Sequence, residues 1–325
     1  MTTLTDQIAL ADTRGVARRQ GPSRGGDAVF RGAAYASALL VLLVLAGILG
    51  SILYGGWPAF REFGFGFLTS SAWNIGTEQY GALVAVIGTL ASALLALVIG
   101  VPISLGIAIY LTQLCPGWAR KPVGMTIELL AAVPSIIYGM WGLFIFAPLF
   151  ARFVQVPVSN LVEGMPLVGT LFYARVPSGV GILTAGIILA IMIVPFVASI
   201  ARDMLDQIPT ILRESAYGIG CTTWEVVRHV LVPQASVSII GAIMLGLGRA
   251  LGETMAVTFV IGNANRLSAS IFDPGSTIAS RIANEFNEAD GMQLNALMAL
   301  GCILFVITFI VLIVARLLTR RAKVA

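Results

Sequence analysis

Residues 206–233 read DQIPTILRESAYGIGCTTWEVVRHVLVP, a stretch that predicts two short helices joined by a tight turn. Pro209 suits the first turn of the first helix, because proline lacks the N–H group that a helix start leaves unpaired. Gly218 and Gly220 are expected to end this helix, since glycine adopts the left-handed conformation at low cost. The stretch is therefore predicted to be structured rather than a flexible linker.

The second helix of the pair has its own start signal. Thr222 and Glu225 form the T-x-x-E capping box, which satisfies free N–H groups at a helix N-terminus. Trp224, Val227 and Leu231 are then expected on one apolar face, with a proline following the helix. A short, capped helix pair indicates a docking surface. The alternative is an ordinary interfacial connector that happens to be helical.

The composition of the whole chain is that of an integral membrane protein. Of 325 residues, 58% are hydrophobic and 11% are charged, and the mean hydropathy is +0.92. A soluble domain of this length carries far more charge. We therefore predict an all-α membrane fold with six transmembrane helices, each able to cross a hydrocarbon core of about 30 Å. The predicted spans are Ala33–Tyr54, Ala82–Leu111, Val123–Phe150, Val180–Ala201, Ser236–Gly262 and Leu294–Ala315.

The second and third predicted spans are longer than a bilayer requires. Overlong spans tilt or break. Gly100, Pro102 and Pro134 are the expected places, because glycine and proline weaken a helix interior. Next to Pro134, Ser135 and Tyr138 are candidates to line a path through the membrane.

Lysine and arginine counts predict the orientation of the spans. The two tails and the inner loops hold 14 of these residues, whereas the loops of the opposite face hold 5. Both termini are therefore expected in the cytoplasm, and the net charge of +4 needs no nucleic-acid partner. The predicted domains are a mobile cytoplasmic tail (1–32), a transmembrane domain (33–318) containing the inner loop 202–235, and a cytoplasmic C-terminal tail (319–325).

Groups for catalysis or metal binding are sparse. His229 is the only histidine, and the three cysteines are expected to be free thiols without a metal role. The chain has no G-x-x-x-x-G-K-[ST] sequence, so any nucleotide that drives it must bind another subunit. We therefore predict no metal, no cofactor and no catalytic residues. An intramembrane enzyme is disfavoured because no nucleophile and base form a recognisable pattern.

The inner loop resembles the EAA motif of ATP-binding-cassette importer permeases. Glu214-Ser215-Ala216 is followed after three residues by Gly220, and VLVP occupies 230–233, nine residues later. In that family the loop is a coupling helix that sits in a groove of the ATPase subunit. The resemblance implies coupling roles for Glu214, Ala216, Gly220 and Pro233, and the apolar character of Trp224 adds this residue.

Three longer runs resemble the phosphate-specific permeases of this class, the PstC family. They are IELLAAVPSIIYGMWGLFIFAPLF (127–150), ESAYGIGCTTWEV (214–226) and IMLGLGRALGETMAVTFVIGN (243–263). The resemblance implies a type I importer permease in the bacterial inner membrane. It also implies three partners: a second, PstA-like permease, a PstB-like ATPase dimer, and a periplasmic or lipid-anchored PstS-like phosphate-binding protein.

Two charges, Arg249 and Glu253, fall near the middle of the fifth predicted span. A charge at this depth costs at least about 2.5–3.5 kcal/mol, so each needs compensation. At a spacing of i,i+4 the two side chains are expected to reach each other on one helix face. A purely structural ion pair is one interpretation. The other is a substrate path, in which the arginine fork binds two phosphate oxygens. The resemblance favours the path. Closer to the cytoplasmic end, Glu128 is expected to meet basic residues.

These observations predict a non-catalytic permease subunit of an ATP-driven importer of inorganic phosphate. One alternative is the same architecture moving another oxyanion, such as molybdate or sulfate. Another is a membrane scaffold that senses phosphate without transporting it.

Overall fold

The structure is a computed structural model that describes residues 24–165 and 168–322. It divides into two units, residues 1–51 and 52–325, and each is described by itself. Within the described residues, six helical segments are long and apolar enough to cross a membrane. The predicted all-α class with six spans is therefore confirmed.

The first unit contributes the beginning of helix α2 (Arg24–Phe63). This helix begins at Arg24, earlier than the start at Ala33 that the hydropathy predicts. The rest of the predicted N-terminal tail, residues 1–23, lies outside the described residues. At the other end of the chain, helix α16 (Gly291–Ala322) continues three residues or more past the start predicted for the C-terminal tail.

Two helices form the centre of the second unit. They are α4 (Leu83–Ile109), which continues as the π-helical turn η1 (Tyr110–Leu114), and α10 (Ile182–Asp206). Small residues bring them together: a Cβ atom added at Gly100 would lie 3.0 Å from the Ile193 side chain. The Ser104 hydroxyl donates to the Val194 carbonyl at 3.3 Å. The break suggested at Gly100 or Pro102 is wrong, because α4 runs through both residues.

The third predicted span, Val123–Phe150, is wrong in its extent, because the chain breaks at Pro134. Helix α5 ends at Ala131, and Pro134 is extended, with ψ 136°. Proline disfavours the helical conformation of the residue before it, which explains a full break rather than a kink. The span then runs through residues 135–162. The elements here are α5 (Gly117–Ala131), α6 (Ser135–Trp141), η2 (Gly142–Phe146), α7 (Ala147–Phe150), η3 (Ala151–Gln155), α8 (Val156–Val162) and, after it, α9 (Val168–Phe172).

The fifth span also breaks, in a different place from its predicted end. Its helical part runs through residues 223–252, so the second helix of the inner loop does not end before Pro233. A π-helical turn precedes this proline and lets the helix continue. The elements are α11 (Thr210–Gly218), α12 (Thr223–Val226), η4 (Val227–Leu231), α13 (Val232–Gly252), α14 (Met255–Val260) and α15 (Ile278–Glu285).

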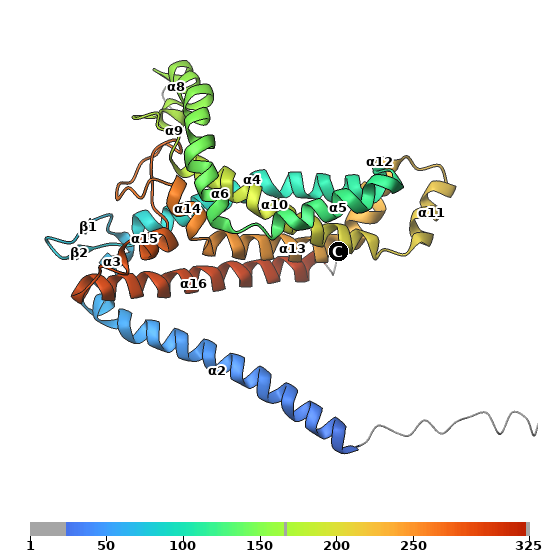
Figure 1. Cartoon of the computed structure of the whole chain (residues 1–325), viewed down its shortest axis with the longest axis horizontal. Coiled ribbons are helices and arrows are strands. Elements are labelled where there is room, and N and C mark those ends of the chain that lie inside the picture. Colours follow the sequence, from blue (N-terminus) through green and yellow to red (C-terminus); the bar gives the residue numbers. More distant parts are fainter. Residues whose placement is uncertain (1–23, 166–167, 323–325) are drawn as a thin grey trace, which may run out of the picture. The chain divides into compact units, whose positions relative to one another are not determined.

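The two ends of the helical bundle carry different structures. Figure 1 shows the inner-loop helices α11 and α12 at one end, and a small hairpin with α15 at the other. The hairpin pairs β1 (Trp73–Asn74) with β2 (Gln79–Tyr80) and follows the short helix α3 (Gly66–Thr69). The Trp73 and Tyr80 rings meet edge to face, with centroids 5.0 Å apart. Because positive loops mark the cytoplasmic side, the α11–α12 end faces the cytoplasm.

Candidate functional site

The charged pair of the fifth span lies at a helix break. Helix α13 ends at Gly252, Glu253 is extended with ψ 126°, and α14 starts at Met255. The expectation that Arg249 and Glu253 share one helix face is therefore wrong. No ion pair joins them among the described residues. Instead, a Glu253 carboxylate oxygen accepts from the Ala256 N–H at 3.4 Å, which places the glutamate as a weak cap for α14.

The second break lies beside the first. Helix α6, which follows the Pro134 break, packs against α14, which follows the Glu253 break. Their approach is close: a Cβ atom added at Gly139 would lie 2.9 Å from the Ala256 Cα. The Tyr138 hydroxyl donates to the Leu130 carbonyl at 2.9 Å and so bridges its own break.

Arg249 lies four residues before Glu253, next to the break in the fifth span. It lies in the last turn of α13, where a positive charge favours the negative end of the helix dipole. It is exposed, and Tyr138 packs against the apolar cluster that contains Ala250 and Leu251, the residues that follow Arg249. Unwound backbone at membrane depth is tolerated where it is buried in protein or lines a water-filled cavity. Among the described residues no ion pair occupies the Arg249 guanidinium, so its donors, near two broken spans, are an arrangement able to hold an anion.

The inner loop has the predicted helix–turn–helix form. Gly220 has φ +90°, the left-handed conformation expected of the turn. The Thr222 backbone N–H donates to the Glu225 carboxylate at 2.7 Å, and the Glu225 N–H donates to the Thr222 hydroxyl at 3.4 Å. The predicted capping box is therefore confirmed. Ala216 is buried in the inner apolar cluster, whereas Glu214 and Pro233 are exposed.

Trp224 does not lie on the buried face of the second helix. Its side chain is 65% exposed, whereas Val227 and Leu231 are 3% and 1% exposed. Val226, and not Trp224, belongs to the buried apolar cluster of the inner loop together with Val227. Trp224 therefore forms part of the exposed surface of the loop and not of its core. Further exposed apolar side chains on this loop were not singled out from the sequence; among them are Ile211, Leu212 and Ile219.

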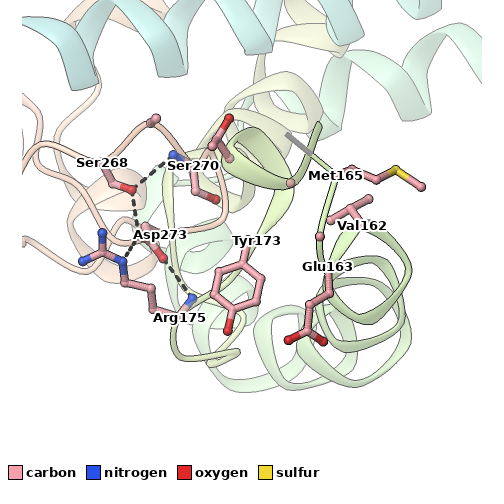
Figure 2. Close-up of a pocket in the computed structure, with 12 residues that line it drawn as sticks. Val162, Glu163, Met165, Tyr173, Arg175, Ser268, Ser270 and Asp273 are labelled. Carbon is pink, nitrogen blue, oxygen red and sulfur yellow. Dashed lines mark hydrogen bonds and ion pairs between the residues drawn. The ribbon is translucent and has the colours of Figure 1, made fainter. Parts of the chain in front are cut away.

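A pocket at the outer end was not predicted from the sequence (Figure 2). It has a volume of about 560 Å³ and lies between residues 162–165 and 169–175 on one side and residues 268–273 on the other. Asp273, only 1% exposed, holds its wall: it accepts from the Ser268 hydroxyl at 2.7 Å and from the Arg175 N–H at 3.3 Å. The Arg175 guanidinium lies 3.7 Å from the same carboxylate. These contacts join two outer loops that are far apart in the sequence. No local sequence pattern predicts them.

A buried arginine holds the outer hairpin. Arg281 on α15 is 2% exposed, and burial lowers its pKa to about 10, so the side chain is charged at neutral pH. Its guanidinium carbon lies 4.4 Å from the centre of the Trp73 ring, a cation–π contact. Its other partners are the Asn265 amide oxygen and the Ser276 hydroxyl. The side chain therefore serves the packing of the outer end.

Known proteins match the chain over most of its length. The family model for the binding-protein-dependent transport system inner membrane component matches residues 100–324. The phosphate transport system permease protein PstC of Pasteurella multocida is 54% identical over 297 residues, covering 91% of this chain and 92% of that protein. PstC of Mesorhizobium japonicum is 53% identical over 296 residues, covering 91% and 90%. A solved bacterial alginate ABC transporter shares the fold, with a TM-score of 0.62 at 16% identity over 92% of this chain and 98% of that one.

The fold and these matches define a class, the multi-pass permeases of the inner membrane that serve binding-protein-dependent transport. Such permeases are transport components. Within this class, the chain belongs to the PstC family of phosphate transport system permeases.

Proposed function

We propose that this chain is the transmembrane permease subunit of an ATP-driven importer of inorganic phosphate. Its relatives are phosphate permeases, and its own fifth membrane-spanning helix carries a cation, Arg249, in its last turn. The observation that carries the proposal is the exposed Arg249 beside two helix breaks. A charge there is costly in an apolar span, and a path for an anion explains why it is kept.

The geometry gives the two charged residues different tasks. Arg249 presents a planar set of donors that fits two oxygens of one phosphate. Glu253 is free of an ion pair with it among the described residues, so the arginine charge is left for the substrate. The nearby carboxylate accepts from a protonated phosphate oxygen and opposes tight binding of the anion. A transport site must release what it binds, and this opposition favours release.

The proposed energy source reaches the chain through the inner loop. ATP binding and hydrolysis take place in a separate, PstB-like ATPase dimer that docks on α11 and α12. Docking and coupling are assigned to five residues of the loop and its flank: Glu214, Ala216, Gly220, Trp224 and Pro233. The exposed apolar side chains of this loop support such a contact. A second, PstA-like permease completes the path, and a PstS-like binding protein delivers phosphate to the outer face.

Phosphate uptake by the reconstituted complex tests the proposal. Arg249→Gln should abolish uptake while the complex still assembles, and Arg249→Lys should retain partial uptake with weaker phosphate affinity, since lysine keeps the charge but loses the fork. Arg152→Gln is the matched control. This exposed outer arginine stacks on Phe153, with 5.6 Å from guanidinium to ring centre, and its loss should leave uptake unchanged.

Competitors define the substrate. Arsenate, which shares the shape and charge of phosphate, should compete, and sulfate and molybdate should not. Normal uptake by Arg249→Gln would exclude the path role. Transport of sulfate or molybdate in place of phosphate would leave the architecture but change the substrate.

A further inference from the structure

The inner end of α10 and the inner loop form one packed unit. Only residues 207–209 separate α10 from α11. Leu205 and Ile208 share an apolar cluster with Ala216 of α11. The Arg213 guanidinium of α11 also donates to the Leu205 carbonyl at 3.3 Å. Because close-packed groups transmit displacement, a movement of the loop carries the last turns of α10 with it.

Ion pairs connect this unit to α5. The Arg202 guanidinium on α10 lies 2.6 Å from the Glu128 carboxylate on α5 and 2.8 Å from that of Asp203. Nearer the cytoplasm, Arg120 of α5 pairs with Asp206 of α10. The expectation that Glu128 meets a basic residue is confirmed. These pairs follow the antiparallel course of the two helices and join them along their inner halves.

The surface of α5 is shaped for Arg202. A Cβ atom added at Gly124, one turn before Glu128, would lie 2.5 Å from an Arg202 terminal nitrogen. The absence of a side chain at Gly124 therefore leaves space for the Arg202 side chain to cross the surface of α5. The Arg202 side chain is only 17% exposed, which protects its pairs from screening better than those of open surface charges.

A hollow of about 530 Å³ borders the ion pairs, and it is lined by equal numbers of basic and acidic side chains. Three basic and three acidic side chains line it, so the hollow does not present the excess positive charge of an anion site. Its lining residues are Arg120, Lys121, Met125, Glu128, Arg202, Asp203 and Asp206.

The far end of α5 leads to the proposed phosphate path. The Leu130 carbonyl, at the end of α5, accepts the hydrogen bond from Tyr138 of α6. Tyr138 in turn packs against the apolar cluster that contains Ala250 and Leu251, the residues that follow Arg249. A shift of α5 therefore changes the surroundings of the arginine that we assign to phosphate.

We propose that Arg202 is a positioning residue that, through Glu128, transmits the movement of the inner loop from α10 to α5 and so to the break at Arg249. This inference rests on the proposed function and adds to it a route for coupling. It differs from a general stabilising role, because it affects how much phosphate moves for each ATP hydrolysed.

A double-mutant cycle in the reconstituted complete transporter tests the inference. Phosphate uptake and ATP hydrolysis are measured for wild type, Glu128→Gln, Arg202→Gln and the double variant, each normalised to assembled complex. Each single change should lower the ratio of phosphate moved to ATP hydrolysed by roughly fivefold, the scale of one lost ion pair. The double variant should be no worse than the worse single one, because both changes remove the same contact.

Lys121 provides the control for this experiment. Lys121→Gln removes a charge from the same hollow, and its side chain makes no ion pair among the described residues, so its ratio should stay at the wild-type value. A ratio unchanged in Glu128→Gln, or uptake and ATP hydrolysis falling together in proportion, overturns the inference. Independent, multiplying effects in the double variant do the same. Absence of phosphate uptake by the wild-type complex instead contradicts the proposed function itself.

Discussion

Thr222 and Glu225 hold each other in a reciprocal contact at the turn of the inner loop. The Glu225 carboxylate accepts from the Thr222 N–H at 2.7 Å and from its hydroxyl at 2.8 Å, and the Thr222 hydroxyl accepts from the Glu225 N–H at 3.4 Å. The contact fixes the direction in which the second helix leaves the turn. Since this helix continues into α13 and ends near Arg249, the direction of the turn and the position of the membrane site are linked.

The first prediction concerns this cap. Thr222→Ala should destabilise the start of the helix by about 1 kcal/mol, because a free N–H group loses its acceptor. We expect faster hydrogen exchange at the turn and weaker retention of the ATPase during purification. Thr223→Ala is the control, since the Thr223 side chain makes no hydrogen bond among the described residues. Equal behaviour of the two variants would show that the cap does not position the docking surface.

The second prediction concerns the turn glycine. Gly220→Ala places a side chain at φ +90°, where L-residues are strained by about 1–2 kcal/mol, although no atom within 4 Å would meet the added Cβ. The expected result is reduced stimulation of ATP hydrolysis by phosphate, measured in the complete transporter.

Gly218→Ala is the matched control for this change. Gly218 is helical and equally open, so alanine should be tolerated there. Wild-type stimulation in Gly220→Ala would refute the importance of the left-handed turn.

The third prediction concerns the packing of the two broken spans. Gly139→Ala forces a methyl group against the α14 backbone, 2.9 Å from the Ala256 Cα. Overpacking of this kind costs about 1–3 kcal/mol and displaces the helices. Phosphate uptake should fall severalfold while ATPase binding stays intact, because the change lies far from the inner loop.

Gly106→Ala, on α4, is the control for the effect of adding a methyl group at a helical glycine away from the α6–α14 contact. An added Cβ at Gly106 meets no atom within 4 Å, so uptake should not change. Full uptake by Gly139→Ala would mean that the approach of α6 to α14 is unimportant for transport.

The fourth prediction concerns the outer hairpin. Trp73→Ala removes the stacking on Arg281, the contact with Tyr80 and a hydrogen bond from the indole N–H to Glu285 at 2.8 Å. Replacing a packed tryptophan with alanine costs about 3–5 kcal/mol, so the thermal unfolding temperature of the solubilised protein should fall clearly.

Trp57→Ala is the comparison for this loss. Trp57 is 61% exposed, and its removal should leave the unfolding temperature nearly unchanged. If both tryptophans behave alike, the buried arginine is held by its polar partners and not by the ring.

The membrane-protein class and the helix–turn–helix form of the inner loop could be predicted from the sequence, because both depend on local patterns. Long apolar runs predict spans whatever packs around them, and T-x-x-E followed by helix formers predicts a cap from neighbouring residues alone. The helix breaks near Pro134 and Glu253 could not be predicted with the same ease from local patterns. The sequence shows a proline at the first break, but at the second only a glycine and a charge that fit a continuous helix equally well.

The sequence by itself determined that this chain spans the membrane six times, carries a capped helix pair on its cytoplasmic side and places Arg249 and Glu253 in an apolar segment. Only the tertiary structure decided that these two charges are separated by a helix break, that Trp224 faces solvent, and that Arg202 joins α10 to α5. The physical reason is that hydropathy and capping act between neighbours in the chain. Breaks and ion pairs are instead settled by which distant helices pack together, as Gly139 with Ala256 and Gly124 with Arg202 show.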